Sequence, residues 1–88
     1  MKNTDITDKD LIPGKWYALM SGNGEYFLKF KEINGYVSCY HYLTPKKQYL
    51  PGGDFSKNTY TFREVHPREI NKYLPADKQE PVELPIFN

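Results

Sequence analysis

Several features common in small proteins are scarce or missing in this 88-residue sequence. It has a single cysteine, Cys39, so no intramolecular disulfide can form, which excludes a disulfide-stapled secreted scaffold. No apolar run is long enough to span a membrane, and residues 1–10 lack the apolar stretch of a signal peptide. We therefore expect a soluble protein in the reducing cytoplasm.

An excess of one charge is also missing, because 12 Lys and Arg face 11 Asp and Glu and the formal net charge is +1. Such a balance does not by itself indicate nucleic acid or an anionic membrane as a partner. The charges are unevenly placed, however. Residues 15–74 carry nine Lys and Arg against five Asp and Glu, whereas residues 1–14 and 75–88 are each net acidic. The central part of the chain is mildly basic.

Catalytic and metal-binding motifs are not found. Cys39 and His41 are two residues apart, which places them on one face of a strand, but a metal site needs three or four ligands. A Cys-His nucleophile pair is one interpretation, and a buried thiol beside a partly exposed imidazole is the favoured one. No paired carboxylates, Ser-His-Asp order, dinucleotide fingerprint or metalloprotease motif is present. We expect no enzyme activity, no cofactor and no metal.

Aromatic residues are abundant instead, since eight Tyr, five Phe and one Trp make up 16% of the chain, and they favour strands. Alternating apolar and polar residues predict strands over 15–20, 25–33, 36–43 and 58–65. The turns expected between the first three are Ser21 to Gly24 and a type I′ turn at Asn34-Gly35. The side chains expected on one side of the third strand are Val37, Cys39, His41 and Leu43.

The C-terminal third has a different pattern. Residues 44–57 have the composition of a loop. From Pro67 a short helix is predicted, with an apolar stripe formed by Ile70, Tyr73 and Leu74, and Pro75 ends it. We expect a flexible N-terminus over 1–10, one domain over 11–75 and an extended, proline-containing tail over 76–88. The predicted fold is mainly β, a small antiparallel, partly open barrel of four or five strands with one short helix near the C-terminus.

A binding surface is the main functional feature that the sequence predicts. The residues expected on the outer sheet face or at its rim are Tyr17, Phe27, Lys29, Lys31, Tyr40, Tyr42, Lys46, Lys47 and Arg63. Aromatic side chains interleaved with cations bind single-stranded nucleic acid. Tyr and Phe patches equally anchor protein interfaces. A third interpretation is that these tyrosines are core residues of a small curled sheet.

Short motifs along the chain resemble those of small proteins encoded by bacteriophages and mobile elements, over residues 12–77. The motifs are Gly14-Lys15-Trp16-Tyr17, Tyr26-Phe27-Leu28-Lys29-Phe30, Gly53-Asp54-Phe55-Ser56, Phe62-Arg63-Glu64-Val65 and Arg68-Glu69-Ile70-Asn71-Lys72-Tyr73-Leu74-Pro75. The resemblance implies an SH3-like barrel that binds rather than catalyses. Proteins of this kind include inhibitors of host defence, among them anti-CRISPR proteins that dock on an RNA-guided nuclease.

From this resemblance we expect a non-enzymatic accessory protein that binds and inhibits a host defence nuclease or ribonucleoprotein in the cytoplasm of the host cell. One alternative is a nucleic-acid-binding module that uses the same aromatic and basic face. A second alternative is a virion structural or assembly protein whose apolar tail, residues 82–87, adds to the sheet edge of a neighbour.

Overall fold

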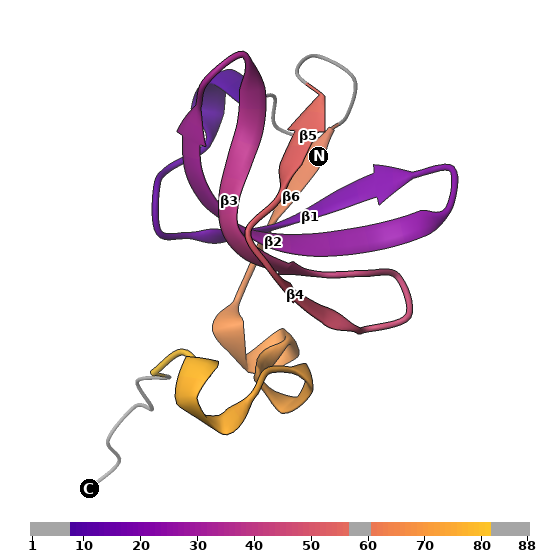
Figure 1. Ribbon diagram of the computed structural model, residues 1–88, viewed down its shortest axis with the longest axis vertical. Helices are drawn as coiled ribbons and strands as arrows, with labels where there is room; N and C mark the ends of the chain where they lie inside the picture. The colour runs from indigo at the N-terminus through magenta and orange to yellow at the C-terminus, as the bar shows by residue number, and fades with distance from the viewer. Residues whose placement is uncertain (1–7, 57–60, 82–88) are drawn as a thin grey trace, which may run out of the picture.

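The computed structural model describes residues 8–56 and 61–81, and Figure 1 shows their path. The elements in chain order are η1 (Asp8–Asp10), β1 (Trp16–Ser21), β2 (Gly24–Ile33), β3 (Tyr36–Leu43), β4 (Tyr49–Pro51), β5 (Asp54–Ser56), β6 (Phe62–Val65), η2 (Pro67–Glu69), η3 (Asn71–Tyr73) and η4 (Ala76–Lys78). The η elements are three-residue 3₁₀ turns, and the described residues contain no α-helix. The prediction of a mainly β antiparallel protein is confirmed, but the predicted C-terminal helix is wrong.

The six strands form one open antiparallel sheet. Its order is β4-β3-β2-β1-β6, and β5 also pairs with β3. The strands number six rather than four or five because the predicted loop, 44–57, contains β4 and β5. These two short strands pair with opposite halves of β3, so this segment follows the sheet edge. Residues 58–60 of the last predicted strand lie outside the described residues.

Residues 67–75 form two successive 3₁₀ turns in place of the predicted helix. Ile70 separates them, with a φ of −122° and a ψ of −10°, and this conformation interrupts the helical path. The stretch between Pro67 and Pro75 is also short, so an α-helix there would have little stability of its own. Its apolar stripe is nevertheless buried as predicted, with Ile70 and Leu74 enclosed and Tyr73 half-buried.

The tail expected to be extended from residue 76 begins with the turn η4, which corrects that prediction for residues 76–78. Beyond it, Asn71 holds the tail at Glu80. The Asn71 side-chain amide donates to the Glu80 carbonyl oxygen at 2.9 Å, and its Oδ1 accepts from the Glu80 N–H at 2.8 Å. The described part of the tail is therefore docked on the domain. Residues 82–88 lie outside the described residues.

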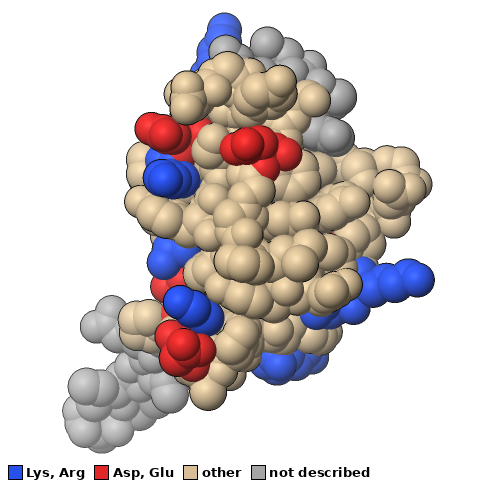
Figure 2. All heavy atoms as spheres, in the orientation of Figure 1, with Lys and Arg blue, Asp and Glu red and all other residues tan. Residues whose placement is uncertain are grey.

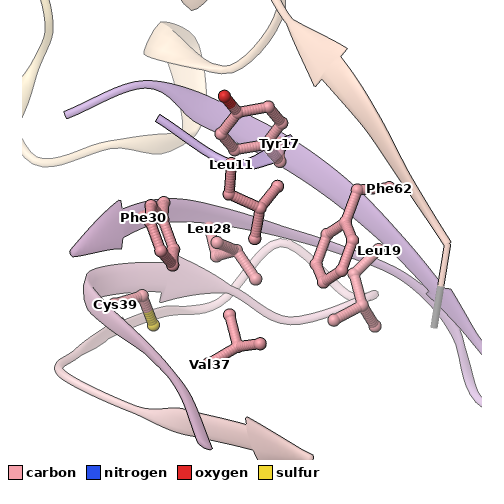
Figure 3. Close-up of a cluster of buried hydrophobic side chains, with 8 residues drawn as sticks. All are labelled: Leu11, Tyr17, Leu19, Leu28, Phe30, Val37, Cys39 and Phe62. Atoms are coloured by element: carbon pink, nitrogen blue, oxygen red, sulfur yellow. The ribbon is translucent and has the colours of Figure 1, made fainter. Parts of the chain in front are cut away.

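Hydrophobic clusters cover both faces of the sheet. The first, whose side chains converge in Figure 3, consists of Leu11, Tyr17, Leu19, Leu28, Phe30, Val37, Cys39 and Phe62. The second consists of Trp16, Ala18, Phe27, Leu43, Val65, Ile70 and Leu74, and so joins the sheet to the turns that lie together at one end of it in Figure 1. Successive residues of β1 enter opposite clusters. Both faces of this strand are consequently buried from Trp16 to Leu19, so its apolar residues do not mark one inner face.

Two bulges between β2 and β3 offset each other. Lys29 pairs with His41, Phe30 pairs with Cys39, and the next pair is Glu32 with Ser38. Tyr40 is therefore an extra residue on β3, and Lys31 is an extra residue on β2. Each extra residue reverses the alternation of side chains along its own strand.

The bulge at Tyr40 corrects the prediction that four residues of β3 share one side. Val37 and Cys39 pack in the first cluster. Leu43 packs in the second, and the His41 ring stacks on Trp16 of that cluster with centroids 5.2 Å apart. All four side chains are buried, but the strand changes face between Cys39 and His41.

The turns between the first three strands agree only in part with the sequence prediction. Ser21 pairs with Gly24, which confirms the first hairpin. At the second hairpin only Asn34 and Gly35 lie between the two strands, but the last cross-strand pair is Ile33 with Val37, so three residues separate this pair. Gly35 has a φ of 73°, whereas Asn34 does not have the positive φ that a type I′ turn requires at both positions. The type I′ prediction is therefore wrong.

Gly52 and Gly53 connect β4 to β5 directly opposite the bulge on β3. The Gly52 N–H donates to the Tyr40 carbonyl oxygen at 2.8 Å, and the Gly53 carbonyl oxygen accepts from the Cys39 N–H at 2.9 Å. Both glycines have positive φ, at 75° and 144°. A Cβ on Gly53 would lie 2.7 Å from the Tyr42 ring, whereas a Cβ on Gly52 would meet open space.

These surroundings predict different costs for two neighbouring substitutions. Gly52→Ala should lower the free energy of unfolding by about 1–2 kcal/mol, because only the backbone is strained. Gly53→Ala should cost a further ~1–3 kcal/mol, because the added methyl group also displaces the Tyr42 ring. Urea unfolding of both variants measures the difference. Equal losses would show that the backbone at position 53 does not approach Tyr42 as closely as described.

Candidate binding surface

Two of the predicted surface aromatics are core residues. Tyr17 is only 1% exposed, and its hydroxyl oxygen accepts the Ile12 N–H at 2.8 Å inside the first cluster. Phe27 is 8% exposed in the second cluster. The prediction that they lie on an open sheet face is wrong, because Tyr17 and Phe27 are on inner strands and lie in clusters that cover the two faces of the sheet.

Tyr42 also lies away from the expected surface. It is half-buried and its ring packs edge-on against Phe55, with centroids 5.3 Å apart, and more obliquely against Tyr26. These rings extend the first cluster. The expectation that Tyr40 and Tyr42 share a face is wrong. Tyr40 is the extra residue of the bulge, and this bulge breaks the regular alternation that would place the two side chains on the same face of β3.

Arg63 on β6, predicted at the basic rim of the sheet face, forms ion pairs with two carboxylates. Its guanidinium reaches Glu25 at 3.2 Å and Glu69 at 3.5 Å. All three side chains are partly exposed, so these ion pairs add little to stability. They connect β6 to β2 and to turn η2.

Lys46 and Lys47 occupy the loop between β3 and β4. Lys46 is exposed, while the Lys47 ammonium lies over the Phe27 ring at 5.4 Å and over the Tyr73 ring at 5.5 Å. The backbone of Lys47 has a φ of 67°, which is uncommon outside glycine. In Figure 2, Lys and Arg side chains lie at the lower right and also along the left side, while uncharged side chains form the middle of the face. Lys46 and Lys47 therefore form a basic group on the β3–β4 loop, separate from Lys29 and Lys31 on β2.

Lys29, Lys31 and Tyr40 come together, as the sequence predicted. The two ammonium groups lie 5.9 Å and 5.8 Å from the centroid of the Tyr40 ring. The tyrosine remains 50% exposed. Cation–π contacts at such exposed sites contribute about 0.5–1 kcal/mol each. We call these three residues the Tyr40 surface.

The bulges explain how this surface forms. Lys31 and Tyr40 are the two extra residues, and a bulged residue projects its side chain away from the regular alternation of its strand. Lys29 pairs with His41, the residue next to Tyr40 on β3. Its ammonium group therefore also reaches the Tyr40 ring. The surface therefore depends on backbone geometry as well as on residue type.

Glu80 supports Lys29 from the docked tail, and no pattern in the sequence indicated this role. One carboxylate oxygen, Oε2, lies 2.8 Å from the Lys29 ammonium and accepts the Trp16 indole N–H at 3.0 Å. Trp16 and Glu80 are 64 residues apart in the chain. Burial alone would raise the pKa of Glu80, but the hydrogen bonds from Lys29 and Trp16 outweigh it and hold the pKa below its ordinary value. The carboxylate is therefore ionised at neutral pH.

His41 lies next to Trp16, the residue that donates to Glu80, whereas Cys39 lies in the first cluster. The His41 ring stacks on Trp16, its Nδ1 is 3.1 Å from the Tyr49 hydroxyl, and its buried Nε2 has no hydrogen-bond partner among the described residues. Burial and the nearby Lys29 lower the pKa of His41. Burial raises the pKa of the Cys39 thiol to about 12, so it stays protonated. Because Cys39 faces the opposite cluster, the two side chains do not form a nucleophile pair.

Comparison of the chain with protein-family models, curated proteins and solved structures gives no match. Among the residues that the structure describes, no group of three or more His, Cys, Asp and Glu side chains is arranged to hold a metal ion. The same residues include no helix with the length and apolar character needed to cross a membrane. The Tyr40 surface and the residues that support it are therefore the features of the molecule that bear on its function.

The environment of His41 predicts how stability depends on pH. Its folded-state pKa lies below the ordinary value of 6.5, so the group is neutral in both states above that pH. As the pH falls below 6.5, the unfolded chain binds a proton that the folded protein resists, and stability is lost. His41→Phe keeps a ring against Trp16 but removes this titration.

Urea unfolding between pH 7 and pH 5 measures the effect. The free energy of unfolding of the native protein should fall more steeply than that of His41→Phe, by at most about 1.4 kcal/mol per pH unit. His66 is present in both proteins and cancels from the comparison. Parallel pH profiles would contradict the buried, neutral state of His41.

Proposed function

We propose that this chain is a non-enzymatic accessory protein of a phage or mobile element that binds and inhibits a host defence nuclease, such as an RNA-guided effector, in the host cytoplasm. The observation that carries the proposal is the Tyr40 surface, a half-exposed tyrosine between two lysines on neighbouring strands of the sheet. Tyrosine is enriched among the residues that dominate protein interfaces. The resemblance of the sequence to small phage proteins supports the choice of target.

The fold within this proposal is a partly open SH3-like barrel. The sheet order supports it, since the first strand lies between β2 and the last strand, β6. The bulges in the long β2–β3 pair support it as well, because bulges increase the curvature that such a barrel needs. Clusters on both sides of β1 keep this scaffold stiff beneath the Tyr40 surface.

A second candidate function is binding of single-stranded nucleic acid by the same surface. The observation that favours it is the position of the Lys29 and Lys31 ammonium groups beside an exposed aromatic ring. Bases stack on such rings while cations contact the phosphates. This candidate predicts an affinity that falls steeply as salt is raised, whereas a protein interface depends on salt much less.

The proposal predicts that Tyr40→Ala lowers partner recovery about tenfold or more, as expected when an interface tyrosine worth ~1.4 kcal/mol or more is truncated. The measurement is capture of partners from a host lysate by the tagged protein, with and without nuclease treatment, followed by mass spectrometry. A large nuclease or ribonucleoprotein should be recovered in both samples. The same preparations are then tested for inhibition of that nuclease.

Tyr36→Ala is the matched control, because Tyr36 lies on the same strand and is 56% exposed, and in the described chain no lysine ammonium lies over its ring. It should recover the partner as the native protein does. Equal losses in both variants would count against the Tyr40 surface. Recovery that disappears after nuclease treatment would replace the inhibitor proposal with the nucleic-acid one.

A further inference from the structure

A groove of about 530 Å³ opens beside the Tyr40 surface, between the start of β1, the end of β6 and turn η2. Part of its lining is apolar, from Trp16, Val65 and Pro67. Trp16 and Val65 belong to the second cluster, so this lining is fixed by the core. The volume is large enough for one long side chain together with part of the backbone that presents it.

Carboxylates from three separate segments also line the groove, together with Gly14, Lys15 and His66. Glu64 is on β6, Glu69 is in η2 and Glu80 is in the docked tail. Lys15 is the one lysine that lines the groove within the described chain, and it pairs with Oε2 of Glu64 at 2.8 Å. Among the side chains that line the groove, three are carboxylates and one is a lysine; Arg63 and Lys29, which pair with Glu69 and Glu80, are not part of the lining.

Two of these carboxylates keep acceptor capacity. Oε2 of Glu80 is shared by Trp16 and Lys29, and Oε2 of Glu64 is held by Lys15. The second oxygen of each has no partner within 8–56 and 61–81. A carboxylate oxygen left in this state accepts hydrogen bonds from a cationic group.

The chemistry of the lining selects one type of occupant. A ligand that fits needs an apolar stem for Trp16, Val65 and Pro67 and a cationic head with several donors for carboxylates on different segments. The arginine side chain has both, and its planar guanidinium donates to two carboxylate oxygens at once. A lysine ammonium provides a single point of charge and matches this arrangement less well.

We infer that this groove binds an arginine side chain that a loop of the partner protein presents while the partner contacts the Tyr40 surface. The inference rests on the proposed function and adds the chemistry of the partner. The two areas are continuous, because the ion pair between Lys29 and Glu80 joins a residue of the Tyr40 surface to a residue of the groove. The partner's contact region then carries an arginine next to the part that covers Tyr40.

The first test uses a defined probe, the peptide acetyl-Gly-Gly-Arg-Gly-Gly-amide, titrated into the full-length protein. Trp16 is the only tryptophan, and its indole N–H donates to Glu80 in the groove, so its nuclear magnetic resonance signal is a unique reporter. The arginine peptide should move this signal in a saturable way. The same peptide with lysine in place of arginine should bind several-fold more weakly. A linear response, or an equal one to both peptides, would overturn the inference.

The second test uses the double variant Glu64→Gln with Glu69→Gln. The ion pairs of both residues are partly exposed, and Gln at position 69 still accepts the His66 N–H that Glu69 now accepts at 3.2 Å, so the variant should fold. It should weaken binding of the arginine peptide at least fivefold. The matched control is Glu32→Gln with Asp77→Asn, which removes two exposed carboxylates outside the groove and should leave peptide binding unchanged.

Capture of the partner separates this inference from the proposed function. If Tyr40→Ala abolishes capture and the double glutamine variant does not, the groove inference is wrong and the proposed function stands. If the double variant abolishes capture and Tyr40→Ala does not, the groove is supported and the Tyr40 surface is wrong. If both variants reduce capture while the double control does not, both proposals are supported.

Discussion

The pair of offsetting bulges between β2 and β3 is the constraint on which the rest of the structure depends. Because Tyr40 and Lys31 are each one residue in excess, the pairing of Lys29 with His41 and of Glu32 with Ser38 belongs to one register. The pairing of β2 with β3 is therefore in the same register on both sides of the bulges, while the alternation of side chains is reversed between them. β3 can therefore supply Cys39 to one cluster and Leu43 to the other.

The second cluster connects this sheet to the end of the chain. The turns after β6 bury Ile70 and Leu74 against β1, and each large apolar side chain buried in this way contributes about 1.5–3 kcal/mol. The docked tail then brings Glu80 to Trp16 and Lys29. The Tyr40 surface and the carboxylate groove meet at this ion pair, so residues remote in the sequence share one support.

Sequence patterns predicted the long strands well and the candidate surface only in part. The ranges 25–33 and 36–43 agree closely with β2 and β3, because alternation and turn residues are local signals. The bulge at Tyr40 could not be seen in the sequence, because the residues around it continue an alternating pattern. Tyr42 was therefore predicted on the outer face, whereas it packs against the first cluster. Tyr17 and Phe27 were misplaced because alternation does not distinguish an inner strand with two covered faces. Glu80 has no local signal, because its role arises from long-range docking.

The most direct test of the bulged register is the pattern of cross-strand nuclear Overhauser effects in the labelled native protein. The account predicts backbone contacts that pair Phe30 with Cys39, together with the pairs of Lys29 with His41 and Glu32 with Ser38 on either side. Contacts that pair Phe30 with Tyr40 and Lys31 with Cys39 would contradict it. The hairpin would then be regular, and the arrangement that brings Lys29 and Lys31 to the Tyr40 ring would not exist.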